Sequence, residues 1–341
     1  MLLGREKVSF LQLPTPLTHL DTLSQELGIN LYLKRDDLTE LGTGGNKLRK
    51  LEYLLQEARE QGATMLLTTG GAQTNHGRLT AAVAARYGLK CAIVAVDPYP
   101  GEISANLILD GIMGCPVYLK QNDGRPESQQ AADAIAQVRE EWEAKGEKVY
   151  FIPVGGSNPV GSLGYYECAL ELSDQIKAMG LDDPRLVTTL GSCGTYTGLA
   201  AAQLNENLPF RLTGVSISPK PEGGKAFAAE KYAEMAQAFH LSATPSPDDF
   251  DVTDAYHCGA YNNPVSEVRQ AIYHMGRSEG IILDPCYTGK TFRGLCDMVE
   301  TGQIRKGETV IMLHTGGIPG IYTRHHREPM EQELEGYIRI I

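Results

Sequence analysis

The sequence lacks the features that mark several classes of protein. Its seven cysteines are odd in number and include no CxxC pair, so neither a zinc site nor a disulfide framework is indicated. No apolar run is long enough to cross a bilayer, and the amino-terminal segment has no apolar signal-peptide core. These absences lead us to expect a reduced, cytoplasmic protein without a membrane-spanning helix.

Basic residues are also scarce. Lysine and arginine number 31 against 42 acidic residues, which gives a net charge of −11. Such an excess argues against nucleic acid and anionic membranes as partners. What is present is ordinary globular composition, with 42% hydrophobic and 21% charged residues in 341, enough for two domains.

Short apolar runs alternate with segments of helical periodicity. This alternation predicts an α/β fold with mostly parallel sheets and helices on both faces. The expected strands are 64–69, 91–96, 116–119, 148–154, 185–190, 212–217 and 309–313. The expected helices are 46–61, 75–88, 126–145, 161–179, 194–205, 263–279 and 288–301. The Gly- and Pro-rich segment 153–164 is the expected crossing between domains.

Three segments rich in Gly, Ser and Thr directly follow predicted strands. They are TGGAQTNHGR (69–78), GSCGTYTG (191–198) and HTGGIPG (314–320). Because ligands of open α/β sheets bind at the carboxyl ends of strands, we expect all three segments to reach one cleft.

The second of these segments has the composition of an anion-binding turn. Its backbone N–H groups and the hydroxyls of Ser192 and Thr195 would face a phosphate at the start of a helix. The same pattern also serves as a plain strand–helix turn with a hydroxyl cap. In segment 69–78, Gln73, Thr74 and their two following neighbours offer neutral donors suited to a carboxylate, with simple N-capping as the alternative.

Lys47 follows glycine-rich backbone in GTGGNKLRK (42–50) and opens a helix. It is not a nucleotide-binding lysine, because Asn46 stands where that motif needs glycine and no GxGxxG occurs at a strand–helix junction. A shielded amine can instead lose its proton and attack an aldehyde. An isolated lysine at this place would more commonly be solvated.

Histidines and two tyrosines complete the candidates. His257, His314, His325 and His326 form no HExxH or comparable pattern, so no metal site is expected. His325 and His326 have the surroundings of an exposed tail. Tyr261 in GAYNNP and Tyr287 in DPCYTGK lie beside turn residues, where packed rings with surface hydroxyls are common.

Five motifs follow one another along the chain: GGNK, GGAQTNH, GSCGTYTG, DPCYTGK and HTGG. Together with LPTPLTHL and YLKRDDLT, they resemble the pyridoxal-phosphate family of D-cysteine desulfhydrase and 1-aminocyclopropane-1-carboxylate deaminase. The resemblance implies fold type II, similar to tryptophan synthase β. It also implies a small α/β domain at 49–158 and a larger cofactor-binding domain of 1–48 plus 159–341, with the cofactor between them.

The resemblance assigns roles to individual residues. Lys47 matches the lysine that carries pyridoxal phosphate, and Asn75 the residue that bonds its phenolic oxygen. Thr74 takes the place of a serine that binds the substrate carboxylate and acts in catalysis. The remaining matches are the phosphate loop (Ser192, Cys193, Gly194, Thr195), the pyridine-nitrogen partner (Thr315), the active-site tyrosines (Tyr261, Tyr287) and the substrate-binding segment (Gln73, Thr74, Asn75, His76).

The implied activity is β-elimination, most simply conversion of D-cysteine to pyruvate, ammonia and hydrogen sulfide. Thr288 replaces the glutamate that deaminases carry after the second tyrosine, which favours elimination of a good leaving group over opening of a cyclopropane ring. The extra methyl of Thr74 is expected to narrow the substrate pocket. L-cysteate sulfo-lyase and 1-aminocyclopropane-1-carboxylate deaminase remain alternatives, as do a non-catalytic cofactor-binding protein and a metal hydrolase. A homodimer is the family expectation.

Overall fold

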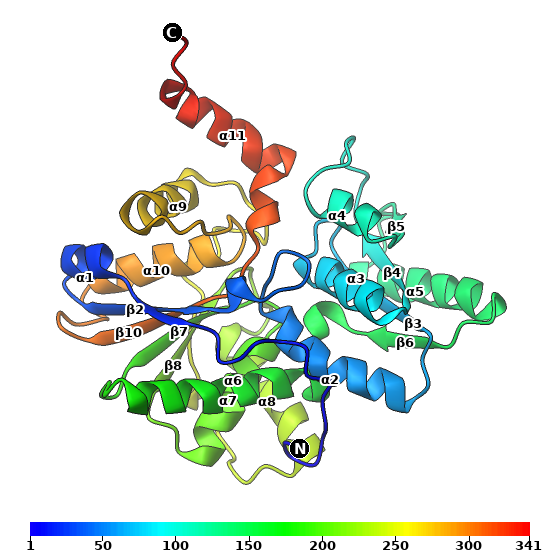
Figure 1. Ribbon diagram of the computed structural model, residues 1–341, viewed down its shortest axis with the longest axis horizontal. Helices are drawn as coiled ribbons and strands as arrows, with labels where there is room; N and C mark the ends of the chain where they lie inside the picture. Colours follow the sequence, from blue (N-terminus) through cyan, green and yellow to red (C-terminus); the bar gives the residue numbers. More distant parts are fainter.

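The computed structural model describes residues 1–341, and its strands form two sheets (Figure 1). The six-stranded sheet has the order β1-β2-β10-β7-β8-β9, and the four-stranded sheet has the order β5-β4-β3-β6. All neighbouring strands run parallel except β1 and β2. The prediction of an α/β fold with mostly parallel sheets is therefore confirmed. The strands are β1 Leu17–His19, β2 Asn30–Arg35, β3 Met65–Gly70, β4 Lys90–Val96, β5 Val117–Lys120, β6 Val149–Ile152, β7 Arg185–Leu190, β8 Arg211–Ser216, β9 Asp251–Thr253 and β10 Thr309–His314.

All seven predicted helices are present. The largest shift is at α9, which was expected from 263 and begins at Ser266, after Pro264. Four helices (α1, α4, α8 and α11) and three strands (β1, β2 and β9) were not predicted. The helices are α1 Asp21–Leu27, α2 Lys47–Glu60, α3 Asn75–Tyr87, α4 Asn106–Ile112, α5 Glu127–Ala144, α6 Pro159–Ala178, α7 Gly194–Glu206, α8 Gly224–Phe239, α9 Ser266–Glu279, α10 Thr288–Glu300 and α11 Arg324–Leu334, with single 3₁₀ turns at η1 Asp36–Leu38, η2 Val154–Gly156, η3 Pro247–Asp249, η4 Ile318–Tyr322 and η5 Glu335–Tyr337.

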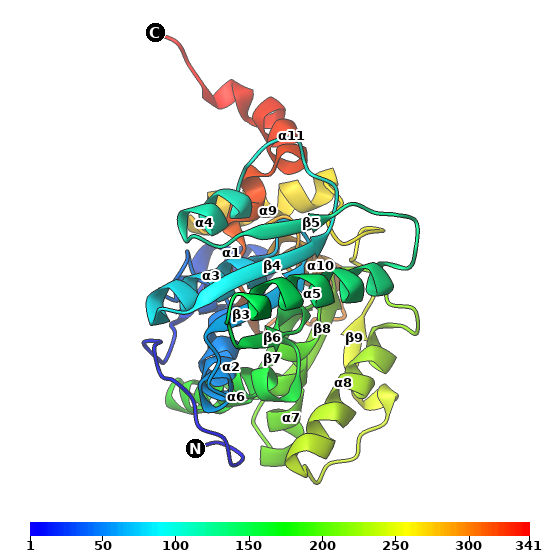
Figure 2. The same ribbon diagram turned by 90° about the vertical axis from the view of Figure 1, so that its right-hand side faces the viewer.

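The two sheets form separate lobes (Figures 1 and 2). The four-stranded sheet, with α3 and α5 beside it, is built from one continuous stretch of chain between β3 and β6. The six-stranded sheet is built from the chain before and after that stretch. The domain bounds 49–158 remain a prediction.

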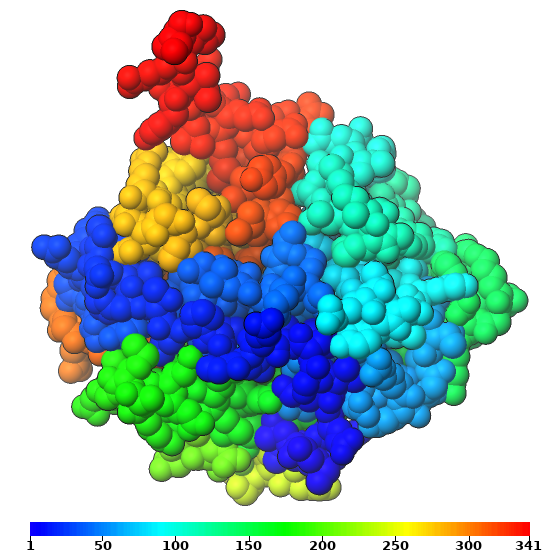
Figure 3. Space-filling model, in the orientation of Figure 1, coloured from blue at the N-terminus to red at the C-terminus, as the bar shows by residue number.

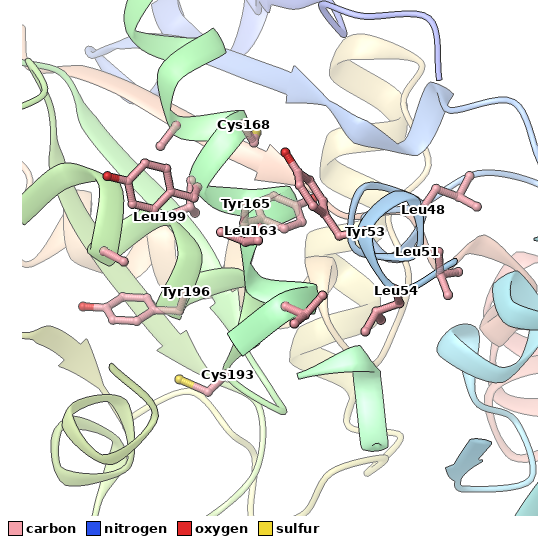
Figure 4. Packing of buried hydrophobic residues seen from close by; sticks show 14 of the residues in the cluster. Leu48, Leu51, Tyr53, Leu54, Leu163, Tyr165, Cys168, Cys193, Tyr196 and Leu199 are labelled. Carbon is pink, nitrogen blue, oxygen red and sulfur yellow. The ribbon is translucent and has the colours of Figure 1, made fainter. Parts of the chain in front are cut away.

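Helix α2 joins the two lobes and is held by the largest hydrophobic core. Leu48, Leu51 and Leu54 recur at helical spacing and are fully buried in this core. Helix α6 packs against α2, and Tyr53 of α2 points towards Tyr165 of α6 (Figure 4). The two backbones approach closely at Gly164, where an added Cβ would lie 2.4 Å from the carbonyl carbon of Arg49. Close packing on this helix fixes the position of its first residue, Lys47.

The carboxyl-terminal helix α11 projects from the body of the molecule and carries the chain end away from the amino terminus (Figures 1 and 3). Tyr337 and Ile338, just beyond it, are exposed apolar residues. None of the helices is both long enough and apolar enough to cross a membrane.

Candidate active site

The three Gly-, Ser- and Thr-rich segments meet where strands of the two sheets end. Asn46 belongs to the glycine-rich loop before Lys47 (residues 42–46), which we call the lysine loop. It links two of the segments to this loop, because its backbone N–H donates to the Thr315 carbonyl (3.1 Å) and its Nδ2 to Thr195 Oγ1 (2.9 Å). The third segment follows β3 and is joined to the lysine loop by Arg78, whose Nη2 donates to the Gly44 carbonyl (3.0 Å). The structure therefore brings these segments together around Lys47.

The glycines before Lys47 are required by sterics. Gly44 has φ +74°, and a Cβ there would lie 2.2 Å from the carbonyl oxygen of Asp37. Gly45 has φ +136°, a conformation that L-residues with side chains avoid, and it lies against the Thr315 carbonyl. Only glycine lets the loop pass this closely before α2 begins.

Lys47 itself is half-buried at the first position of α2. Its Nζ donates to Oδ1 of Asn46 at 3.1 Å and makes no ion pair. Burial lowers the pKa of the amine to about 8; the Asp284 carboxylate opposes this shift and the Arg78 guanidinium adds to it. A useful fraction of Lys47 is thus unprotonated near neutral pH, as a nucleophile or base requires.

Residues 192–195 form a cradle at the start of α7. Cys193 adopts a left-handed conformation (φ +72°), which turns the backbone before the helix. The amides of Cys193 and Thr195 have no acceptor within the protein, and Gly194 N donates to Ser157 Oγ at 3.1 Å. The hydroxyls of Ser157 and Ser192 lie 2.8 Å apart. Free amides, hydroxyls and a helix amino terminus together suit a phosphate group.

Lys50 also belongs to this cradle and was missed from the sequence. It is fully buried, and its Nζ contacts the Gly155 carbonyl (3.1 Å) and Ser157 Oγ (3.2 Å) without any acidic partner. A Cβ on Gly194 would lie 2.7 Å from this amine. Burial, together with the charge of Lys47, holds the pKa of Lys50 well below its ordinary value. The sequence feature that could have identified Lys50 is its position three residues after Lys47, on the same helix face.

Such a buried amine lacks the counter-ion that would normally accompany it. A dianionic phosphate placed among the free amides would supply that charge. The residues present therefore fit the phosphate group of the cofactor that the sequence resemblance implies.

The start of α3 offers donors for a carboxylate. Thr74 is the N-cap, and its Oγ1 accepts from Gly77 N at 3.3 Å. The backbone amides of Asn75 and His76, the first of the helix, have no acceptor in the protein. A small anion could therefore bind here through two amides and the Thr74 hydroxyl.

Two side chains of the predicted substrate segment are engaged elsewhere. Gln73 Nε2 donates to Ser104 O (3.1 Å), and its Oε1 accepts from Asn106 N (2.9 Å). The ring of His76 is buried, and its Nε2 pairs with Thr68 Oγ1 at 2.9 Å. These two side chains are thus engaged within the protein, and the binding of substrate by residues 73–76 remains a prediction.

Two threonines lie where the pyridine ring is expected, and only one has a free hydroxyl. Thr288 Oγ1 donates to Asp284 Oδ1 (2.7 Å) and accepts from Asp284 N (2.8 Å). Asp284 also accepts from three backbone amides at the start of α10, so its oxygens are occupied. Thr315 Oγ1 has no hydrogen-bond partner in the protein and is free to bind a ligand, and its role at the pyridine nitrogen remains a prediction.

Tyr261 and Tyr287 face one another. Their hydroxyls are hydrogen-bonded, and their rings pack edge to face at 5.7 Å and 80°. Burial raises the pKa of the Tyr287 phenol well above its ordinary value, so it remains a proton donor at neutral pH. The buried amine of Lys290 fixes the Tyr261 loop, because four carbonyl oxygens, those of Ile217, His257, Ala260 and Tyr261, surround it at 2.7–2.9 Å and share its three N–H donors.

Two of the candidate histidines are buried and hydrogen-bonded within the protein. His314 Nδ1 accepts from Gly316 N at 3.2 Å, which places its proton on Nε2, towards the Ile282 carbonyl. His326 is buried within α11 and pairs with Asn262 Oδ1 at 2.7 Å, so the expectation of an exposed tail is wrong for this residue. No three His, Cys, Asp or Glu side chains lie close enough together to hold a metal ion.

Comparison with known proteins identifies the group to which this architecture belongs. The sequence profile described as pyridoxal-phosphate dependent enzyme matches residues 8–316. A D-cysteine desulfhydrase of Yersinia enterocolitica is 40% identical over 318 residues, covering 91% of this chain and 93% of the relative. The crystal structure of an ACC deaminase homologue is 34% identical, covers 97% of both chains and superposes with a TM-score of 0.86.

A more distant structure shares the fold. Threonine deaminase isoform 2 from Solanum lycopersicum is 17% identical, with a TM-score of 0.66 and coverage of 96% of this chain and 85% of that one. The predicted fold type II is thereby confirmed, and pyridoxal phosphate is the cofactor of the matching family. The chain therefore belongs to the family of pyridoxal-phosphate dependent enzymes.

Proposed function

We propose that this enzyme is a lyase that eliminates the β-substituent of a small amino acid, with D-cysteine as the first candidate substrate. The products would be pyruvate, ammonia and hydrogen sulfide. The proposal is supported by similarity to D-cysteine desulfhydrases. It rests on one observation: threonine hydroxyls stand where the ring nitrogen is expected, and the nearby Asp284 carboxylate is engaged by Thr288 and backbone amides.

The cofactor, when bound, supplies an electron sink for the negative charge that develops on the substrate α-carbon. Lys47 would hold it covalently, and Asn75 would bond its phenolic oxygen. The cradle of Lys50, Ser192, Cys193, Gly194 and Thr195 would hold its phosphate, with Thr315 against its ring nitrogen.

Lys47 would also serve as the base of the reaction. Its amine, with a pKa of about 8, would take the α-proton of the substrate. Thr74 and the free amides of Asn75 and His76 would bind the substrate carboxylate, which orients the α-proton towards Lys47. Tyr287, hydrogen-bonded to Tyr261, would give a proton to the departing thiolate.

Thr288 decides between elimination and ring opening. Its hydroxyl and the oxygens of Asp284 are satisfied by one another and by backbone amides, so neither can keep the ring nitrogen protonated. Thr315 is neutral. A weaker electron sink still permits departure of a good leaving group, whereas opening a cyclopropane demands a stronger one. This supports β-elimination over the deaminase activity of similar proteins.

A substrate panel tests the proposal. Pyruvate release would be measured with both enantiomers of cysteine, serine, cysteate and diaminopropionate, and 2-oxobutanoate release with 1-aminocyclopropane-1-carboxylate. We expect turnover of D-cysteine above the others. Preference for L-cysteate would mean that the leaving group is sulfite. Efficient opening of the cyclopropane ring would contradict the argument from Thr288. No turnover of any substrate would favour a non-catalytic cofactor-binding protein.

We also propose a cytoplasmic homodimer. All seven cysteines are free, which supports a reducing compartment. The segment beyond the projecting α11 carries the exposed apolar residues Tyr337, Ile338 and Ile340, which supports self-association. Light scattering during size-exclusion chromatography distinguishes a dimer from a monomer.

A further inference from the structure

Arg78 is a buried cation in the first turn of α3, a place that disfavours it. Desolvation penalises the charge, and so does the positive end of the helix dipole. Its main countercharge, Asp110, makes no hydrogen bond with it, and Arg78 Nε has no partner either. Arg78 is therefore not explained as half of a stabilising ion pair.

Both of its terminal nitrogens, in contrast, donate hydrogen bonds, and these reach three segments of the site. Nη1 donates to Oδ1 of Asn75 and to Oδ1 of Asn106, both at 2.7 Å, and Nη2 donates to the Gly44 carbonyl at 3.0 Å. Arg78 thus connects the glycine loop before Lys47 to the starts of α3 and α4.

These contacts dictate the orientation of the Asn75 amide. A guanidinium has donors only, so the atom that faces Arg78 must be the amide oxygen. Asn106 Nδ2 donates to the same oxygen at 3.0 Å. Asn75 Nδ2 finds no acceptor in the protein and is left as a donor for a ligand.

We propose that Arg78 is a positioning residue, which holds the Asn75 amide with its nitrogen towards the phenolic oxygen of the cofactor. The inference rests on the proposed contact between Asn75 and that oxygen, and it deepens the proposed function. Without Arg78, the amide could rotate and present its oxygen to another oxygen, which is repulsive.

A double-mutant cycle on cofactor binding tests the inference. Arg78→Met, Asn75→Ala and the double variant would be prepared as apoproteins, and the dissociation constant for pyridoxal phosphate measured with the visible spectrum of the bound form. We expect Arg78→Met to weaken binding roughly ten-fold and to shift the visible band. In the Asn75→Ala background, Arg78→Met should have a much smaller effect on both quantities than in the wild type, because its main effect passes through Asn75 and only the bonds to Asn106 and to the Gly44 carbonyl are then lost.

Three further variants keep the test decisive. Arg86→Met, on the exposed face of the same helix, should leave both readouts unchanged. Arg78→Lys keeps the charge but loses the planar fork, so it should resemble Arg78→Met and serves in its place if that variant does not fold. Asp110→Asn keeps every hydrogen bond of Arg78 and should leave the band in place.

Additive effects in the cycle, or a normal band and affinity in the folded Arg78 variants, would overturn the inference. These outcomes are distinct from a wild-type protein that stays colourless with pyridoxal phosphate, which would refute the proposed function itself.

Discussion

The γ-methyl of Thr74 occupies the space next to Gly77. A Cβ at position 77 would lie 2.4 Å from this methyl and 2.7 Å from Cδ1 of Ile93. The extra methyl that distinguishes threonine from serine therefore packs towards the interior of the four-stranded lobe. This corrects the sequence-based expectation that the methyl narrows the substrate pocket, and it makes positions 74 and 77 interdependent.

Gly77→Ala should destabilise the protein and disturb the carboxylate site. The new methyl must displace Thr74 or Ile93, at a cost of about 1–3 kcal/mol, although alanine is the better helix former. We expect a lower thermal midpoint and a lower kcat/KM. The double variant Thr74→Ser/Gly77→Ala removes the opposing methyl and should recover most of both losses. Failure of this rescue would show that the two positions are independent.

Lys47→Ala should abolish covalent capture of the cofactor and reduce kcat by at least about a hundred-fold, since both anchor and base are lost. The rate at which wild-type apoprotein captures pyridoxal phosphate should rise with pH and level off above about 8, where the amine is unprotonated. Borohydride reduction followed by mass measurement checks the anchor, and stopped-flow absorbance checks the pH profile. A rate that keeps rising up to about pH 10, as an ordinary lysine would give, would contradict the lowered pKa.

Lys50→Met should weaken binding of pyridoxal phosphate by roughly 10–100-fold, because one charge-assisted contact to the phosphate is lost. Binding of pyridoxal, which has no phosphate, should change little. The ratio of the two dissociation constants measures this contribution directly. An equal loss for both ligands would mean that Lys50 acts only on the shape of the cradle.

Asp110→Asn should stabilise the apoprotein at alkaline pH. Burial raises the pKa of this carboxyl to about 7, whereas an aspartate in an unfolded chain titrates near 4. The folded protein then holds an extra proton between these values, so its stability falls as pH rises through that window. We expect a gain of roughly 2–4 kcal/mol at pH 8 and a smaller one at pH 5, measured by urea unfolding. An equal effect at both values would exclude titration of Asp110 as the cause.

Much of the framework could be predicted because the apolar runs of parallel strands are unambiguous. The runs that became β3, β4, β7, β8 and β10 are continuous and buried, and each glycine-rich turn follows one of them. Helix α8 could also have been predicted, since Ala228, Tyr232 and Met235 recur at helical spacing.

Other features depend on tertiary contacts that sequence spacing does not show. Strand β2 ends in Lys34 and Arg35, which do not look like a buried strand; Lys34 is buried because Glu171 and Gln175 of α6 receive its amine. In the same way, Gln73 and His76 carry suitable donors, but Ser104 and Thr68 engage them first. Lys50 became a candidate only when η2 placed Gly155 beside it.

Lys47 and Lys50, two amines one helical turn apart, affect the stability of the protein before it binds its cofactor. Both are desolvated, neither forms an ion pair, and the charge of Lys47 disfavours protonation of Lys50, a cost that a bound phosphate would relieve. Binding energy is then also folding energy. A cell short of vitamin B6 would hold fewer intact copies of this protein, because the unliganded chain is the one that proteases degrade.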